Sequence, residues 1–160
     1  MNVDLLQGTT SGSTRVMSKT GWSNSSVFLE YLQRHFVRYI QRPDSSQAVL
    51  LIFNGHTSHI NVPALEWAQR NNIILFVLPT HTSHCLQSLC VGCFGPLQKI
   101  YNNMCHKFMR DNPSSEITRF NVASLAPKAY VKALSISNLV ASFKKTGIHP
   151  LSKSRQLHAV

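Results

Sequence analysis

The clearest helical pattern in the chain lies in residues 27–40, VFLEYLQRHFVRYI. Apolar side chains recur there every three or four positions, at Phe28, Leu32, Phe36 and Tyr39. This spacing is typical of an amphipathic helix that packs one face on a core. The polar run at 23–26 supplies helix-capping side chains, and Pro43 marks the end of the helix.

A second pattern combines two continuous apolar runs, AVLLIF at 48–53 and IILFVL at 73–78, with the helical sequence VPALEWAQRNN between them. Unbroken apolar runs of this length are typical of parallel strands that are covered on both faces. Strand, helix and strand within about thirty residues predict a right-handed βαβ unit. Ligands of such sheets bind beyond the carboxyl ends of the strands, here Asn54-Gly55-His56 and Pro79-Thr80-His81.

The remainder of the chain is predicted to be helical, with an apolar stripe at Leu97, Ile100, Met104 and Phe108. The sequence 111–113 ends this helix. Further helices are expected at 122–134, with Pro127 weakening the start, and near 137–146, closed by Gly147. The expected organisation is a polar, weakly structured segment at 1–21, a domain at 22–112, a helical part of the same domain at 113–150 and a tail at 151–160.

The second half of the chain carries most of the positive charge of the protein. The protein has 16 Lys and Arg against 6 Asp and Glu, a net charge of +10, and ten of these basic residues lie in 94–160 beside two acidic ones. Such an excess favours a polyanionic partner, nucleic acid above all. The candidate phosphate contacts are Lys99, Lys107, Arg110, Lys144 and Lys145. The alternative is an ordinary solvated surface, because the basic residues are mostly spread singly.

The sequence also bears on compartment and on metals. No apolar signal region follows Met1, and the longest apolar run is too short to cross a bilayer, so we expect a soluble intracellular protein with no membrane partner. Its four cysteines are then thiols or metal ligands. Cys90 and Cys93 have zinc-knuckle spacing, which side chains at His81, His84, Cys105 or His106 would complete, but a second such pair is missing. Buried thiols are the simpler interpretation.

A hard-metal site requires converging carboxylates, because Mg²⁺ prefers charged oxygen ligands. The six acidic residues are Asp4, Glu30, Asp44, Glu66, Asp111 and Glu116, and neither predicted strand end carries one of them. The crevice beyond the predicted strands therefore lacks negative charge.

Three stretches of the chain resemble a known family: LLIFNGHTSHI, NIILFVLPTHTSHCLQSLCVGCFGPLQKIYN and FKKTGIHPLS. With SKTGWSNSSVFLEYLQRHF before them, they resemble the DDE superfamily endonuclease domain of pogo, Tigger and jerky-like transposases, which a centromere-binding protein shares. The resemblance runs from about residue 12 to residue 152. It implies an RNase H-like fold in which three aspartates hold two Mg²⁺ or Mn²⁺ ions that cut and join DNA.

By position, the aspartate of the family's DGH motif falls on Asn54, and the aspartate of its LQPLDVG motif falls on Cys90. The resemblance places the first aspartate on an early strand upstream of Trp22, in sequence that this chain does not include. We therefore expect a degenerate, N-terminally truncated α/β domain, a partial RNase H-like fold followed by a helical segment, with an unpaired strand edge or a bare apolar face. Gly55, His56, His59, His81 and His84 correspond to the family's loops after the strands, where the histidines are expected to hydrogen-bond rather than bind zinc.

The expected function is non-specific DNA binding in the nucleus, or otherwise the cytoplasm, with no cofactor and no catalysis, because no metal-holding carboxylate remains at the matched positions. Three alternatives stay open at this point. The chain is a module that pairs with transposase-like proteins, a decayed transposon remnant without selected function, or a zinc-binding module.

Overall fold

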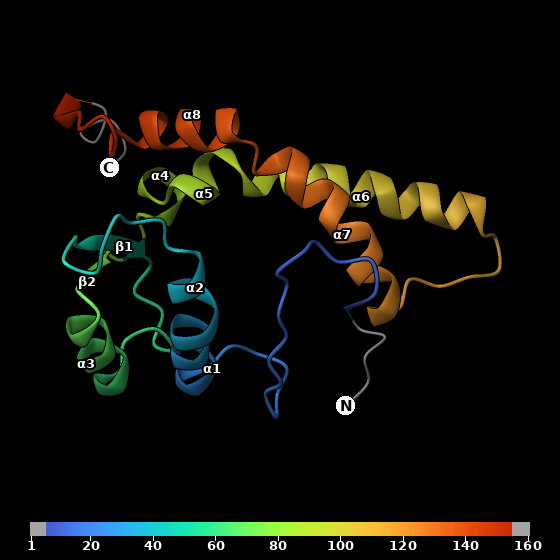
Figure 1. Ribbon diagram of the computed structural model, residues 1–160. Helices are drawn as coiled ribbons and strands as arrows, with labels where there is room; N and C mark the ends of the chain where they lie inside the picture. Colours follow the sequence, from blue (N-terminus) through green and yellow to red (C-terminus); the bar gives the residue numbers. More distant parts are fainter. Residues whose placement is uncertain (1–5, 155–160) are drawn as a thin grey trace. The chain divides into compact units, whose positions relative to one another are not determined.

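The computed structural model describes residues 6–154, and the chain divides into two compact units (Figure 1). The first unit comprises Thr14–His81, and the second comprises residues 82–160 together with residues 1–13. The first unit combines helices with a small parallel sheet, whereas the second is helical in its described part. The fold is thus a mixed helix and sheet architecture, consistent with the predicted α/β class.

The first unit begins with one continuous helical segment. Helix α1 (Ser25–Tyr31) passes through a π-helical stretch, η2 (Leu32–Phe36), into α2 (Val37–Tyr39). The Asn24 side chain caps the start, because its Oδ1 accepts a hydrogen bond of 3.0 Å from the Val27 N–H. The helix predicted over 27–40 is therefore confirmed, with its start two residues earlier.

The two predicted strands and the helix between them are also present. Strand β1 (Val49–Phe53) pairs in parallel with β2 (Ile73–Val77), and Leu51 lies opposite Leu75. Helix α3 (Val62–Arg70) connects them, and the Asn61 Oδ1 caps it by accepting a 2.9 Å hydrogen bond from the Ala64 N–H. The predicted order of strand, helix and strand, with the two strands parallel, is confirmed.

The two faces of this sheet differ in their environment. On one face Leu51 packs against a core of Phe28, Leu32 and Ala64, which belong to the helices α1, η2 and α3. On the other face the side chains are about half exposed: Leu50 55%, Ile74 54% and Phe76 50%. The expectation that both faces are covered is therefore wrong for the described residues. A continuous apolar run predicts a strand, but it does not show whether other elements cover both faces of the sheet.

The second unit contains the helices α4 (Ser83–Leu86), α5 (Ser88–Gly92), α6 (Phe94–Asp111), α7 (Arg119–Ala133) and α8 (Ile136–Thr146). Helix α6 packs against α7, and α5 packs against α8 (Figure 1). The predicted end of α6 at Asp111 and the closure of α8 by Gly147, which has a φ of 69°, are confirmed. Helix α7 begins three residues before the predicted 122, because Thr118 and Asn121 form a capping box.

Small side chains allow α5 and α8 to approach each other closely. A Cβ atom on Gly92 would lie only 2.5 Å from the Cβ atom of Ser142. The Ser88 Oγ and Thr146 Oγ1 atoms are 3.2 Å apart and form a buried hydrogen bond. This contact fixes α5, the helix that carries Cys90.

Candidate functional site

The loop after β1 begins with Asn54, the residue at the carboxyl end of that strand. Asn54 is partly buried, and its Oδ1 atom is shielded from solvent without a hydrogen-bond partner within the described residues. Gly55 follows, and a Cβ atom there would lie 3.3 Å from the Val77 Cγ1 atom. The loop therefore passes close to the end of β2, where parallel sheets place their ligands.

The two histidines of this loop have different surroundings. The Nδ1 atom of His56 lies 2.8 Å from the Ser58 Oγ and accepts a hydrogen bond of 3.3 Å from the Ser58 N–H. His59 instead packs as a ring, with its centroid 4.6 Å from that of Phe28 and 5.7 Å from that of Phe53. Its Nδ1 atom is buried without a hydrogen-bond partner among the residues that the structure describes. His56 thus stabilises the loop by hydrogen bonding, and His59 by packing.

The second pair of histidines lies on two different units. His81 ends the first unit and has a φ of 63°, a left-handed backbone conformation that is uncommon outside glycine. His84 lies in the short helix α4 of the second unit. Both side chains are exposed.

The two cysteines of the CVGC sequence differ sharply in burial. Cys90 is exposed on α5, although its partial burial raises the pKa of the thiol. Cys93 is completely buried, and its Sγ atom lies 3.9 Å from the Ser142 Oγ of α8. Within residues 6–154 no group of three His, Cys, Asp or Glu side chains is placed to hold a metal ion.

The donor atoms at positions 54 and 90 do not suit Mg²⁺ or Mn²⁺, the ions that the family resemblance implies. Asn54 offers one neutral amide oxygen, which lacks the charge that draws a hard cation out of water. Cys90 offers a soft sulfur atom, and its raised thiol pKa disfavours the thiolate form that binds metals. Neither residue replaces a carboxylate.

The candidate phosphate contacts lie on the helices of the second unit. Lys99, Lys107 and Arg110 are exposed on α6, and the Lys107 Nζ atom pairs with Asp111 at 2.7 Å. Lys144 and Lys145 occupy the last turn of α8. Positive side chains at this position stabilise a helix, because its C-terminal end carries the negative end of the helix dipole. These two lysines therefore have a structural reason for their position.

The structure adds a polar hollow around Lys99 that the sequence patterns did not reveal. It has a volume of about 350 Å³ and is lined by Gly95, Gln98, Lys99, Asn102, Asn103 and His106. These residues recur at three- and four-residue spacings, so they share the exposed face of α6 opposite its apolar stripe. The same helical periodicity would have located this face from the sequence.

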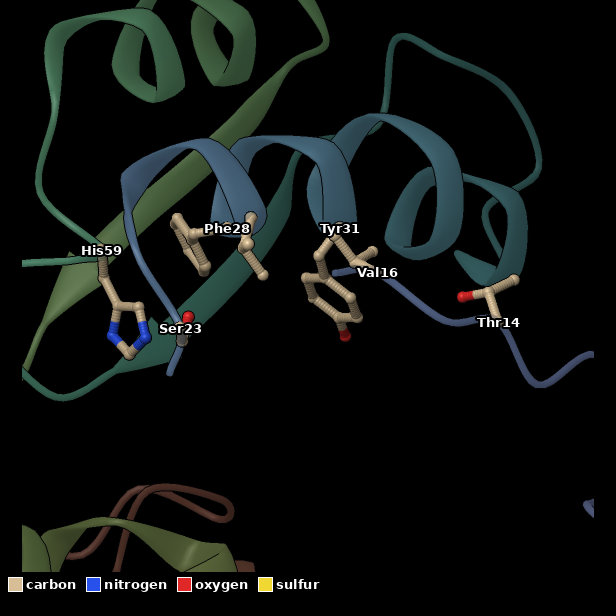
Figure 2. Close-up of a pocket in the computed structure, with 7 residues that line it drawn as sticks. Thr14, Val16, Ser23, Phe28, Tyr31 and His59 are labelled. Carbon is tan, nitrogen blue, oxygen red and sulfur yellow. The ribbon is translucent and has the colours of Figure 1, made fainter. Parts of the chain in front are cut away.

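A second cavity of about 410 Å³ lies in the first unit (Figure 2). It is lined by Thr14, Val16, Ser23, Phe28, Tyr31 and His59, together with Val27. The lining residues come from the segment before α1, from α1 itself and from the loop after β1. No spacing pattern links these segments, so this cavity could not be predicted from the sequence.

Comparison with known proteins identifies the family. The DDE superfamily endonuclease family matches residues 9–145, which is most of the chain. The protein belongs to the DDE endonuclease superfamily. Asn54, which follows β1, and Cys90, which lies in α5, are both inside the matched region of this DDE domain.

One curated relative is the MFS-type transporter clz9 of Cochliobolus lunatus, which is 31% identical over 140 residues. The alignment covers 84% of the DDE domain chain but only 14% of that protein. No solved structure matches the chain. Over residues 6–154, the DDE domain has no helix that is both long enough and apolar enough to cross a membrane.

Proposed function

We propose that this DDE domain binds nucleic acid through the basic surface of its second unit and does not cleave it. The observation that carries the proposal is the pair Asn54 and Cys90, which stand where the resemblance places metal-binding aspartates. Endonuclease chemistry of this type depends on carboxylates that hold two metal ions on either side of the scissile phosphate. A neutral amide oxygen and a soft sulfur atom do not replace those charged carboxylate oxygens.

The finer classification is part of the same proposal. The motifs NGHTSH and LQSLCVGC resemble those of the pogo, Tigger and jerky-like branch of the superfamily. We infer that β1 and β2 are neighbouring strands of an RNase H-like sheet. Their parallel pairing and the crossover through α3 support this inference.

Retained nucleic-acid binding is supported by charge. The net charge is +10, and α6 presents Lys99, Lys107 and Arg110 on exposed positions. An 18-residue helix is about 27 Å long, so its cations span several phosphates of a DNA strand. Contacts to phosphates carry no sequence information, so the binding is expected to be independent of sequence.

We expect Lys99→Gln and Arg110→Gln each to weaken binding to a random-sequence DNA duplex, because each removes one cation that displaces counterions from phosphates. The logarithm of the affinity falls linearly with the logarithm of the salt concentration, and each substitution should make this negative slope shallower by about 1. The measurement is a fluorescence-anisotropy titration at several salt concentrations. Arg70→Gln is the charge-matched control, since Arg70 lies on α3 of the first unit and pairs with Glu66 at 3.7 Å.

The binding proposal is contradicted by an affinity that does not fall with salt. An equal loss in the Arg70→Gln control would also contradict it, because net charge alone would then explain the binding.

A second candidate function is pairing with another protein, which the sheet favours. The apolar side chains of Leu50, Ile74 and Phe76 are about half exposed on one face. Within the described residues, β1 and β2 pair only with each other, so each has an open edge. Light scattering, with the DDE domain alone and mixed with another DDE-domain protein, distinguishes self-association and pairing from a monomer.

A further inference from the structure

We propose that the cavity beside α1 binds an unpaired nucleobase of a single-stranded nucleic-acid segment. This inference deepens the proposed nucleic-acid binding and rests on it. In this proposal a base stacks in the cavity of the first unit, in addition to the phosphate contacts of the second unit.

The geometry of the cavity suits a flat ring. Figure 2 shows the labelled side chains in a row beside the helical segment that begins with α1 and continues through η2, from His59 at one end to Thr14 at the other. The rings of His59 and Phe28 are packed on each other with centroids 4.6 Å apart. Tyr31 lines the same cavity with 43% of its surface exposed, and its ring is also stacked on that of His35 at a centroid distance of 5.5 Å. Aromatic rings in such positions are the surfaces on which unpaired bases stack.

The chemistry of the lining also favours a base over other ligands. Among the described residues that line the cavity there is no Lys, Arg, Asp or Glu, so the cavity suits a neutral group. The hydroxyl groups of Thr14 and Ser23 provide polar atoms for the edge of a base. A volume of about 410 Å³ is within the range of small-molecule sites. The elongated, open row fits one part of an extended strand better than an enclosed small molecule.

The surroundings of the cavity are compatible with a phosphate backbone. Arg34 and Arg38 are exposed on the same helical segment as Tyr31, one and two turns further along the chain. An aromatic side chain of a protein partner would also fill the cavity, but the positive charge of the chain favours a polyanion.

The test compares two single-stranded oligonucleotides of equal length and charge, one with bases and one with abasic sites throughout. The intact protein should bind the base-containing strand about five- to hundredfold more tightly, the range that one stacked base provides. Tyr31→Ala should remove this difference and leave binding of the abasic strand unchanged. Val16→Trp should do the same by filling the cavity, without removing the Tyr31 ring.

Tyr39→Ala is the matched control, because Tyr39 is a 50% exposed tyrosine on the same helical segment that does not line the cavity. It should preserve the preference for bases. A loss in Tyr39→Ala equal to that in Tyr31→Ala would overturn the cavity assignment.

The remaining outcomes separate this inference from the function on which it rests. Equal binding of both strands by the unmodified protein overturns base recognition and leaves phosphate binding intact. Absence of binding to either strand overturns both proposals.

Discussion

Leu32→Ala is expected to lower the free energy of unfolding of the first unit by about 2–5 kcal/mol, the usual result of deleting a fully buried leucine side chain. Leu32 is 0% exposed and lies with Phe28 and Ala64 at the centre of the core beneath the sheet. The truncation leaves a void between η2 and the helix α3, which surrounding side chains fill only in part. Both tryptophans, Trp22 and Trp67, belong to the first unit, so fluorescence during urea denaturation reports on this unit.

Leu50→Ala is the control for this measurement, because it deletes the same atoms from a side chain that is 55% exposed. Its effect should remain within about 0.5 kcal/mol, as for most surface substitutions. Similar losses in the two variants would show that the face with Leu50 is covered as well as the face with Leu51. That result would contradict the described core.

Gly92→Ala is expected to destabilise the second unit by about 1–3 kcal/mol, the typical effect of inserting a methyl group into a close-packed contact. The new Cβ atom would lie 2.5 Å from the Ser142 Cβ atom and 3.2 Å from its Cα atom, so α5 and α8 must move apart. Amide hydrogen exchange in α8 measures the loss directly. Faster exchange throughout α8, including the buried Ser142 and Thr146, is the expected result.

Gly95→Ala tests the same substitution at a glycine only three residues away. An added Cβ atom there meets nothing within 4 Å. This change should be neutral or should stabilise α6 by up to about 1 kcal/mol, because alanine restricts the unfolded chain and favours the helix. If both variants exchanged alike, the close approach of α5 to α8 would be refuted.

Local sequence patterns predicted those elements whose start or end depends on local chemistry. Asn24 lies in the polar run that was expected to cap the first helix, and Gly147 ends α8 in the left-handed conformation that glycine favours. The strand pair was recognisable because β1 and β2 are unbroken apolar runs around a helical period. In such elements the residues that determine the start or the end lie within about one helical turn of it, so a short stretch of sequence is enough for the prediction.

Elements that depend on tertiary contacts were not predicted. Helices α4 and α5 have four and five residues and no side-chain cap, so nothing in their own sequence favours them over a loop. Helix α5 is held instead by the contact of Gly92 with Ser142, which are fifty positions apart in the sequence. The apolar pattern did not show the half-exposed face with Leu50, because apolar sequence does not show which faces other elements cover. The expectation of a bare apolar face or an open strand edge came from the family resemblance alone.

The candidate site divides in the same way. Asn54 was placed at a strand end by the apolar pattern. The spacing of Cys90 and Cys93 singled out Cys90 as a candidate zinc ligand, and only the family motif matched it to an aspartate position. The cavity with Tyr31 and His59 joins segments 28 residues apart in the sequence and has no motif. Its recognition required the folded first unit.

We propose that positions 54 and 90 do not provide metal-binding carboxylates, and that the domain therefore binds DNA without cutting it. The most direct measurement is the conversion of supercoiled plasmid to nicked or linear DNA by the purified protein with Mg²⁺ or Mn²⁺, beside an identical purification of an Asn54→Ala variant. We expect no conversion above the buffer control at protein concentrations that saturate the DNA. Robust nicking that requires the metal, is stopped by a chelator and is lost in Asn54→Ala would contradict this proposal.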